Sequence, residues 1–265
     1  MRKVYLVLLS LLVVCVGCQW QMTHTDAVEK RSDEVVIERF DRVERLYLTM
    51  ADFAALQQLK TDYAVQTRTL LENVLQLGPV NDPDICTRWL VFFQDSTLQA
   101  LLRDVEQQYA DMDDLNKQLT GAFRRLARLF PDMEPPRVYA QVGSLDQSIV
   151  VTDSMLGISL DKYLGADYPA YLRYGYSERQ RRMMTREYIV PDCLGFYLLS
   201  LFPLPQDADS TRARQRWHMM KIQYVVNQVI GQRVFSNDTI SQIEKYRKSH
   251  PQLSVAELIM LDSIR

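Results

Sequence analysis

Three short runs rich in apolar and β-branched residues lie close together in the middle of the chain. The first run alternates Val138, Ala140 and Val142 with more polar neighbours, and this period of two is typical of a half-buried strand. The second and third runs cover 148–152 and 155–160, and turn-forming residues separate all three runs. Because the connections are too short for parallel crossovers, the pattern predicts a small antiparallel meander.

Most of the remaining chain has apolar residues at every third or fourth position, which is the spacing of an amphipathic helix. Helices are predicted over 52–77, 86–93, 98–109, 113–130, 191–201, 211–230 and 238–248. A last helix is predicted after Ser254, because serine followed three residues later by Glu257 forms a capping box. The sequence therefore predicts an α+β fold, in which a mostly helical single domain surrounds a small antiparallel sheet.

The segment 35–47 fits two kinds of local structure. Residues 35–41 are rich in β-branched side chains, which favours a strand. Phe40, Val43 and Tyr47 have the spacing of a helical stripe instead. We expect a short strand over 35–41 as the first element of the domain.

The start of the chain has the pattern of an export signal. Arg2 and Lys3 supply a positive charge before an apolar run over 4–16, which is too short for a comfortable transmembrane helix. The run ends at Gly17, directly before Cys18, and a small residue in that position is typical of a bacterial lipobox. We therefore expect Cys18 to be the acylated first residue of the mature chain.

Three positions before the acylated cysteine an aliphatic residue is usual, and this chain has Cys15 there. An ordinary secretory signal or an uncleaved anchor is the alternative. The predicted organisation is a lipoprotein signal peptide over 1–17, a polar tether over 18–32 and a domain over 33–265. Gln19 follows the acylated cysteine, and the lack of aspartate there predicts transport to the outer membrane.

The composition is that of an ordinary globular protein, with 47% hydrophobic and 24% charged residues. A chain of 265 residues can bury a sizeable core. The formal net charge is −2 and there is no polybasic stretch. Phosphate binding needs a basic face, so we exclude nucleic acid as a partner.

Two cysteines, Cys86 and Cys193, lie inside the predicted domain. An exported protein can form a disulfide, whereas the apolar neighbours Ile85 and Leu194 favour two buried thiols. Sequence alone does not fix the geometry that a disulfide needs, so both states stay open.

Few residues of the chain are suited to catalysis. The histidines His24, His218 and His250 are scattered, and no paired cysteines or histidines occur in the predicted domain over 33–265, so zinc has no ligand set there. We expect no catalytic residue, no metal and no cofactor. Asp161 and Asp192 are predicted to cap helix starts, where their oxygens accept free amide hydrogens. The alternative for both aspartates is cation binding or acid–base chemistry.

A stretch rich in tyrosine and arginine, over 168–182, follows the predicted sheet. It contains Tyr168, Tyr171, Arg173, Tyr174 and Tyr176. Both residue types are enriched at interface cores, because they give a large contact area and keep a polar group. We therefore predict a partner-binding surface at these residues. The alternative is that the tyrosines cover the sheet and the arginines are solvated.

Several segments form a series that resembles a known family. They are 37–41, 75–78, 129–131, 157–165, 168–171 and 183–192. The most specific are Ile158 to Gly165, which reads ISLDKYLG, and Arg186 to Asp192, which reads REYIVPD. Together they resemble the GldB-like gliding-motility lipoprotein family of Bacteroidetes.

The resemblance implies a lipid-anchored envelope protein, with an acyl chain such as palmitate on Cys18, in the outer membrane and facing the periplasm. Its partners would be the membrane, through the lipid, and other envelope proteins. The implied function is non-catalytic support of a gliding- or secretion-associated assembly. The alternatives are a degenerate or metal-independent peptidase-like hydrolase and a small-ligand-binding lipoprotein.

The family also resembles, distantly, zinc peptidases that carry His-Glu-x-x-His on a helix after a small sheet. In this chain that helix begins with Pro191, Asp192 and Cys193, and it offers no such ligand pair. Members also tend to have a glycine followed by lysine in a second stretch. Here Gly231 is followed by Gln232, so a function tied to that lysine is in doubt.

Overall fold

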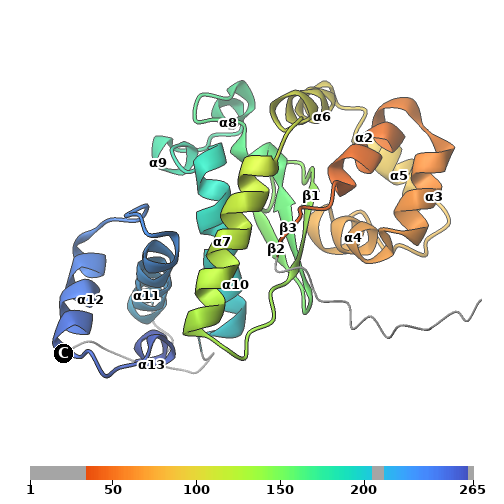
Figure 1. Ribbon diagram of the computed structural model, residues 1–265. Helices are drawn as coiled ribbons and strands as arrows, with labels where there is room; N and C mark the ends of the chain where they lie inside the picture. Colours follow the sequence, from red (N-terminus) through yellow and green to blue (C-terminus); the bar gives the residue numbers. More distant parts are fainter. Residues whose placement is uncertain (1–33, 205–211, 262–265) are drawn as a thin grey trace, which may run out of the picture. The chain divides into compact units, whose positions relative to one another are not determined.

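The computed structural model describes residues 34–204 and 212–261 (Figure 1). The chain divides into Met1–Ser32 and Asp33–Arg265, and every element below belongs to the second unit. The predicted signal peptide, the tether and Cys18 lie outside the described residues. No helix in the described ranges is both long enough and apolar enough to cross a membrane.

The sheet has three strands, β1 (Arg137–Gln141), β2 (Ile149–Val151) and β3 (Met155–Ser159), in the spatial order β1-β3-β2. β2 and β3 are antiparallel, whereas β1 and β3 are parallel. The prediction of an antiparallel meander is therefore wrong, and the sheet is mixed. A short connection cannot join two adjacent parallel strands directly, but here β2 intervenes in the chain, and β3 then returns between its two predecessors.

Every residue of the central strand β3 is buried. Gly157 of β3 lies opposite Tyr139 of β1, and a Cβ atom at this glycine would be only 2.5 Å from Cζ of the tyrosine ring. The tyrosine ring therefore occupies the space that the glycine leaves free. Burial on both faces explains why the β3 sequence is apolar rather than alternating.

The expected strand over 35–41 is reduced to one isolated bridge, in which Glu38 pairs in parallel with Tyr139. The Glu38 amide donates to the Val138 carbonyl at 2.8 Å, and the Ala140 amide donates to the Glu38 carbonyl at 2.9 Å. The helix α2 (Phe40–Met50) begins two residues later. Its apolar stripe, rather than its β propensity, decides the local structure, because the stripe is buried in the core.

The predicted helix over 52–77 is broken into three pieces. They are α3 (Phe53–Thr61), α4 (Ala64–Arg68) and a π-helical segment η1 (Thr69–Val74). The buried Thr67 hydroxyl donates to the Leu59 carbonyl at 2.8 Å, which links α4 back to α3 across the break. A continuous apolar period does not reveal such a break, because both pieces keep the same buried face.

The next three helices follow the predicted ranges closely. They are α5 (Ile85–Phe92), α6 (Ser96–Gln108) and α7 (Asp113–Leu129). Asp95 caps α6, where its carboxylate accepts hydrogen bonds from the Thr97 and Leu98 amides.

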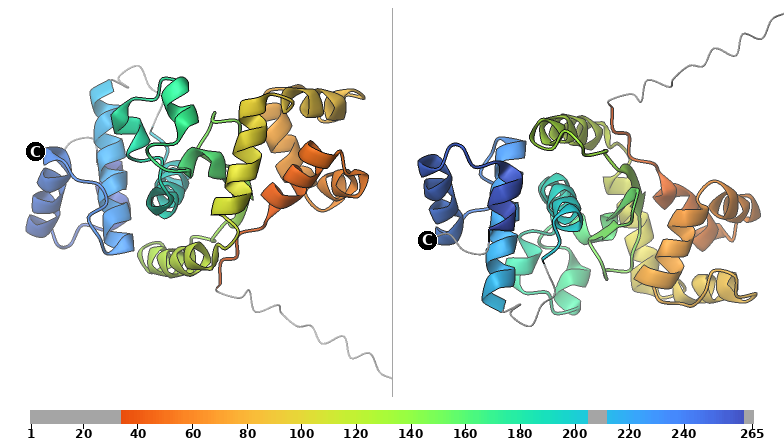
Figure 2. Two further views of the ribbon diagram at one scale, coloured as in Figure 1. Left: turned by 90° about the horizontal axis from the view of Figure 1, so that it is seen from above. Right: turned by 90° about the horizontal axis from the view of Figure 1, so that it is seen from below.

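Short helices follow the sheet and lead into the helix predicted from Pro191. They are η2 (Leu160–Tyr163), α8 (Pro169–Arg173), α9 (Glu178–Arg181), η3 (Arg186–Tyr188) and α10 (Ile189–Leu201). α10 contacts β2, β3 and α7 on one side and α11 on the other (Figure 2). The motif 186–192 therefore lies where a helix from the sheet layer meets the C-terminal helices.

The C-terminal helices are α11 (Arg212–Ile230), α12 (Asp238–Ser249) and α13 (Val255–Met260). The predicted capping box of the last helix is confirmed, with Ser254 and Glu257 bonded in both directions. Cys193 is buried, Cys86 is partly buried, and both are free thiols. The disulfide alternative is therefore wrong.

Candidate functional site

The tyrosines of the predicted partner surface are held by hydrogen bonds of the domain. Tyr171 is completely buried, and its hydroxyl donates to the Asp161 carbonyl at 2.6 Å and accepts from the Leu164 amide at 2.9 Å. The hydroxyl of Tyr168 donates to Asp104 at 2.8 Å, and that of Tyr176 donates to the Leu145 carbonyl at 2.6 Å. These three side chains fix the stretch to the domain.

Arg173 and Tyr174 of the same stretch are exposed, together with their neighbour Leu172. Tyr174 is 58% exposed and Leu172 is 56% exposed. The five predicted residues therefore separate into three that anchor α8 and its following loop and two that face solvent.

Asp161 and Asp192 do not cap helices with their side chains, so the capping interpretation is wrong. The buried Asp161 carboxylate accepts from the Gly143 amide at 2.8 Å and the Leu145 amide at 2.5 Å, so it holds the loop after β1. Burial raises the pKa of Asp161. The Tyr163 hydroxyl donates to Asp192 at 2.8 Å, and burial raises the pKa of Asp192 to about 6.

A cleft of about 580 Å³ lies between α7, the segment from η3 to the start of α10, and the chain that follows α11. Its lining residues are Asp114, Leu115, Gln118, Arg125, Arg186, Glu187, Tyr188, Val190, Pro191, Ile230, Gln232 and Val234. Both the 186–191 motif and the stretch around Gly231 reach this cleft, although about forty residues separate them in the sequence. Its volume is within the usual range of ligand sites, so we treat it as the candidate site.

Arg186 closes one end of the cleft. Its guanidinium donates to both carboxylate oxygens of Asp114, at 3.1 and 2.5 Å, and to the Asp111 carbonyl at 2.9 Å. The same group lies 5.0 Å from the centre of the Tyr109 ring. Hydrogen bonding to Arg186 lowers the pKa of Asp114, so this pair is ionised at neutral pH.

The opposite wall is the loop after α11. Gly231 adopts a positive φ of 78°, which ends the helix, as is common for glycine in that position. The buried Asn227 side chain then accepts from the Phe235 amide at 2.9 Å and donates to the Phe235 carbonyl at 2.7 Å. The ring of Phe235 contacts Tyr188 with 6.2 Å between centroids, so the loop is held against the motif helix.

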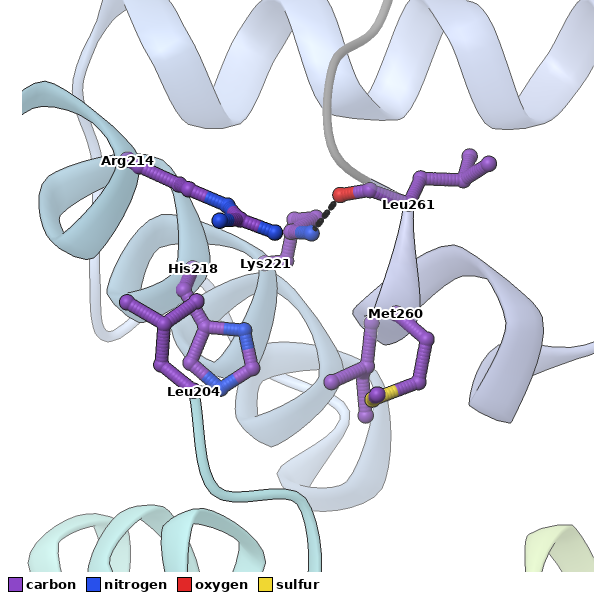
Figure 3. A pocket seen from close by; sticks show the side chains of 7 residues that line it. Leu204, Arg214, His218, Lys221, Met260 and Leu261 are labelled. Carbon is purple, nitrogen blue, oxygen red and sulfur yellow. Dashed lines mark hydrogen bonds between the residues drawn. The ribbon is translucent and has the colours of Figure 1, made fainter. Parts of the chain in front are cut away.

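A much smaller cavity, of about 30 Å³, lies beside α11 (Figure 3). The buried His218 shares a hydrogen bond of 2.7 Å with the Phe202 carbonyl, and Lys221 donates to the Leu261 carbonyl. Burial lowers the pKa of His218. This volume holds about one water molecule, so the cavity is not a ligand site.

The residues of the cleft were not singled out from the sequence. Arg186 and Glu187 belong to the motif that carries the family resemblance, but nothing there gave them a role. Arg125 belongs to a basic helix end that reads as a solvated turn. The absence of a metal site stays a prediction. Within the described ranges, no three residues among His, Cys, Asp and Glu come together in a way that could hold a metal ion.

Fold and site define a mostly helical α+β domain, with a mixed three-stranded sheet and a cleft of mixed charge at its C-terminal helices. A family model described as gliding motility protein GldB matches residues 21–237, so the chain belongs to this family. It is thus a lipoprotein associated with gliding motility, in the cell envelope. Comparison with curated proteins and comparison with solved structures gave no match.

Proposed function

We propose that the protein is a non-catalytic, lipid-anchored component of the outer membrane, facing the periplasm, which binds another envelope protein in a gliding- or secretion-associated assembly. The observation that carries this proposal is the exposed surface of α8. Leu172, Arg173 and Tyr174 are presented to solvent on a helix that the buried Tyr171 fixes to the core. An apolar, an arginine and a tyrosine side chain together are typical of the centre of a protein interface.

The charged groups of the domain support a non-catalytic function. In the cleft, Asp114 and Arg186 neutralise one another. Cys193 is completely buried, and burial raises the pKa of its thiol well above the ordinary value, so the nucleophilic thiolate does not form at neutral pH. A buried, protonated thiol has a packing role rather than a chemical one.

The test is the double substitution Arg173→Ala and Tyr174→Ala in the full chain, with the amount of co-purifying envelope protein measured from solubilised membranes. We expect that amount to fall severalfold, because the exposed side chains carry the contact, and the melting temperature to change little. Tyr171→Phe is the opposite control, since it removes a buried hydroxyl. It should lower the melting temperature while the folded protein still captures the partner. Undiminished co-purification by the double variant would contradict the proposal.

A peptidase-like hydrolase is the second candidate function. The observation that favours it is Asp192, whose pKa of about 6 is suited to acid–base catalysis near neutral pH. Peptide hydrolysis by the purified chain that is lost in Asp192→Asn, with the fold retained, would support this candidate. Hydrolysis that a chelator abolishes would instead show a metal-dependent activity.

A further inference from the structure

The cleft follows one stripe of α7. Asp114, Gln118 and Arg125 are four and then seven residues apart, and such positions lie on the same side of a helix. With a rise of 1.5 Å per residue, this stripe is about 16 Å long. An extended peptide advances about 3.3 Å per residue, so a segment of about five residues matches the length of the cleft.

Arg125 supplies a positive charge at one end of the stripe. Its Nε–H donates to the Val229 carbonyl, one of the last carbonyls of α11, and this contact fixes the direction of the side chain. Within the described residues, neither Nη group has a hydrogen-bond partner. These two groups form a planar pair of donors that matches the two oxygens of a carboxylate.

Gly121 provides the surface on which this arginine rests. It lies inside the 17-residue helix α7, where glycine costs about 1 kcal/mol relative to alanine. A Cβ atom there would be 3.4 Å from Nη1 of Arg125. That separation is an ordinary van der Waals contact, so the guanidinium lies back along α7 against Gly121, one turn before Arg125.

The other end of the cleft repels a carboxylate. The donors of Arg186 are already used by Asp114 and by two main-chain carbonyls. Glu187 is exposed there, and its hydrogen bond with the Thr185 side chain lowers its pKa, so it is ionised at neutral pH. The cleft is therefore negative at one end and positive at the other, which gives a bound ligand one orientation.

The walls between the two ends are apolar but carry two side-chain amides. Val190, Pro191 and Ile230 supply the apolar surface. Gln118 and Gln232 are exposed, and in the part of the chain that the structure describes their side chains have no hydrogen-bond partner. An amide both donates and accepts, as the peptide backbone does, whereas an alkyl chain would leave both amides unpaired.

We propose that this cleft binds the last few residues of an apolar protein C-terminus, with the terminal carboxylate on the two Nη groups of Arg125. Gln118 and Gln232 bond the backbone of the segment, and its side chains contact the apolar wall. The proposal goes beyond the partner contact at α8, because it concerns a different surface. Each therefore fails or holds without the other.

The test uses the full chain in detergent and a pool of fluorescent pentapeptides, random in alanine, valine, leucine and serine, with the label on the amino end. One pool has a free terminal carboxylate and the other a terminal amide. We expect the dissociation constant of the free-acid pool, from fluorescence anisotropy, to be about tenfold lower, as for a charge-assisted bond worth about 1.4 kcal/mol.

Arg125→Gln should remove this difference between the two pools, whereas Arg124→Gln, the same change on the adjacent exposed arginine outside the cleft, should preserve it. Gln232→Glu keeps Arg125 and its contact with α11. It should weaken binding of the free-acid pool severalfold more than that of the amide pool, because both pools lose the amide donor and only the charged end is also repelled by the new carboxylate. This variant keeps the test valid even if Arg125→Gln loosens the end of α11.

Equal affinity for the two pools would overturn the proposal, as would no binding of either pool at 1 mM peptide. Displacement of the bound free-acid pool by an equal concentration of laurate would also overturn it, since the cleft would then be a site for fatty acids. A preference for the free acid that persists in Arg125→Gln would move the carboxylate site elsewhere on the protein.

Discussion

Single residues determine which substitutions the sheet and its neighbouring helix accept. Tyr139 is buried, and its ring lies over Gly157 on the neighbouring strand. The tyrosine and the glycine are therefore one packing unit, although eighteen positions separate them. Gly195, in the middle of α10, is the opposite case, since an added Cβ would have no atom within 4 Å.

Gly157→Ala should lower the free energy of unfolding by about 1–3 kcal/mol, because the new methyl group forces a buried ring to move. Gly195→Ala should raise it by about 0.5–1 kcal/mol, because alanine favours helix and the position has room. Urea unfolding of both variants measures the contrast. An unchanged unfolding free energy for Gly157→Ala would show that the Tyr139 ring can move aside without cost.

Glu44 is the most deeply buried acidic residue of α2. One of its carboxylate oxygens accepts from the Val142 amide at 2.9 Å, and the other has no partner among the described residues. Burial, and to a smaller extent the nearby Asp161 and Asp41, raises the pKa of Glu44 well above 4.5. The folded state therefore holds a proton on Glu44 that the unfolded state releases above that pH.

Because the folded form binds the extra proton, the stabilisation is complete at low pH and decreases as the pH rises above about 4.5. Glu44→Gln keeps an acceptor for Val142 and cannot ionise, so it should exceed the wild type in unfolding free energy by about 1 kcal/mol or more at pH 8. The two proteins should converge towards pH 4.5. Glu34→Gln, an exposed control, should show the same pH dependence of the unfolding free energy as the wild type. If the curves of Glu44→Gln and the wild type ran parallel instead of converging, ionisation of Glu44 would not be the cause.

At the scale of elements, Arg186 joins parts of the chain that are far apart in sequence. It contacts the end of α6 through the Gln108 carbonyl and the Tyr109 ring, and the start of α7 through Asp114. It is also the first residue of η3, which leads directly into α10. One side chain therefore links the end of α6, the start of α7 and the segment before α10 beside the cleft.

Arg186→Lys should lower the unfolding free energy by about 1–2 kcal/mol, because a lysine ammonium cannot make the two parallel bonds to Asp114 and a carbonyl bond at once. Arg182→Lys is the matched control. Arg182 is exposed, and among the described residues its side chain pairs only with Glu178, one turn earlier on the same helix, so the unfolding free energy of this variant should not change. Wild-type stability of the Arg186→Lys variant would show that packing of α10, rather than the Arg186 side chain, holds these helices together.

The helices that the sequence predicts correctly are those with a strong local signal. Helices such as α7 and α12 have a clear apolar period, and the Ser254 box marks the start of α13. The mixed sheet could not be predicted in this way, because alternation identifies strands but not their order. The break at 62–63 is bridged by one buried side-chain bond, from Thr67 to Leu59, which leaves no periodic signal in the sequence.

The candidate site was largely hidden from the sequence for a related reason. Tyr171 and Tyr174 are the same residue type in the same stretch, so the sequence does not distinguish them. Only the fold shows that Tyr171 is buried and Tyr174 is exposed. The Asp161 carboxylate does accept from main-chain amides, but these belong to the loop around Gly143 rather than to a helix start. Arg125 and Arg186 line the same cleft although they lie far apart in the sequence, and no local sequence pattern links them.

At the scale of the whole molecule, the acylation expected at Cys18 decides where the domain is held. Two or three acyl chains give stable membrane anchoring, whereas a single chain gives only marginal binding. Cys18→Ala should therefore move the protein from the membrane fraction towards the soluble one. Cys15→Ala should remain in the membrane fraction, since acylation is expected at Cys18 and not at Cys15. Equal membrane association and identical masses for wild type and Cys18→Ala would reject lipidation.

The bridge between Glu38 and β1 has a mechanical consequence. Within the described residues, force that enters the domain from its N-terminal side reaches this segment before it reaches α2. The Val35 amide bonds the Thr120 hydroxyl at 2.9 Å, the Ile37 amide bonds Asn116 at 3.0 Å, and Glu38 bonds β1 on both sides. A pull along the bridge loads these bonds together in shear. The start of the domain is therefore held by hydrogen bonds to both α7 and the sheet. Such a pull is then resisted before α2 begins to unwind.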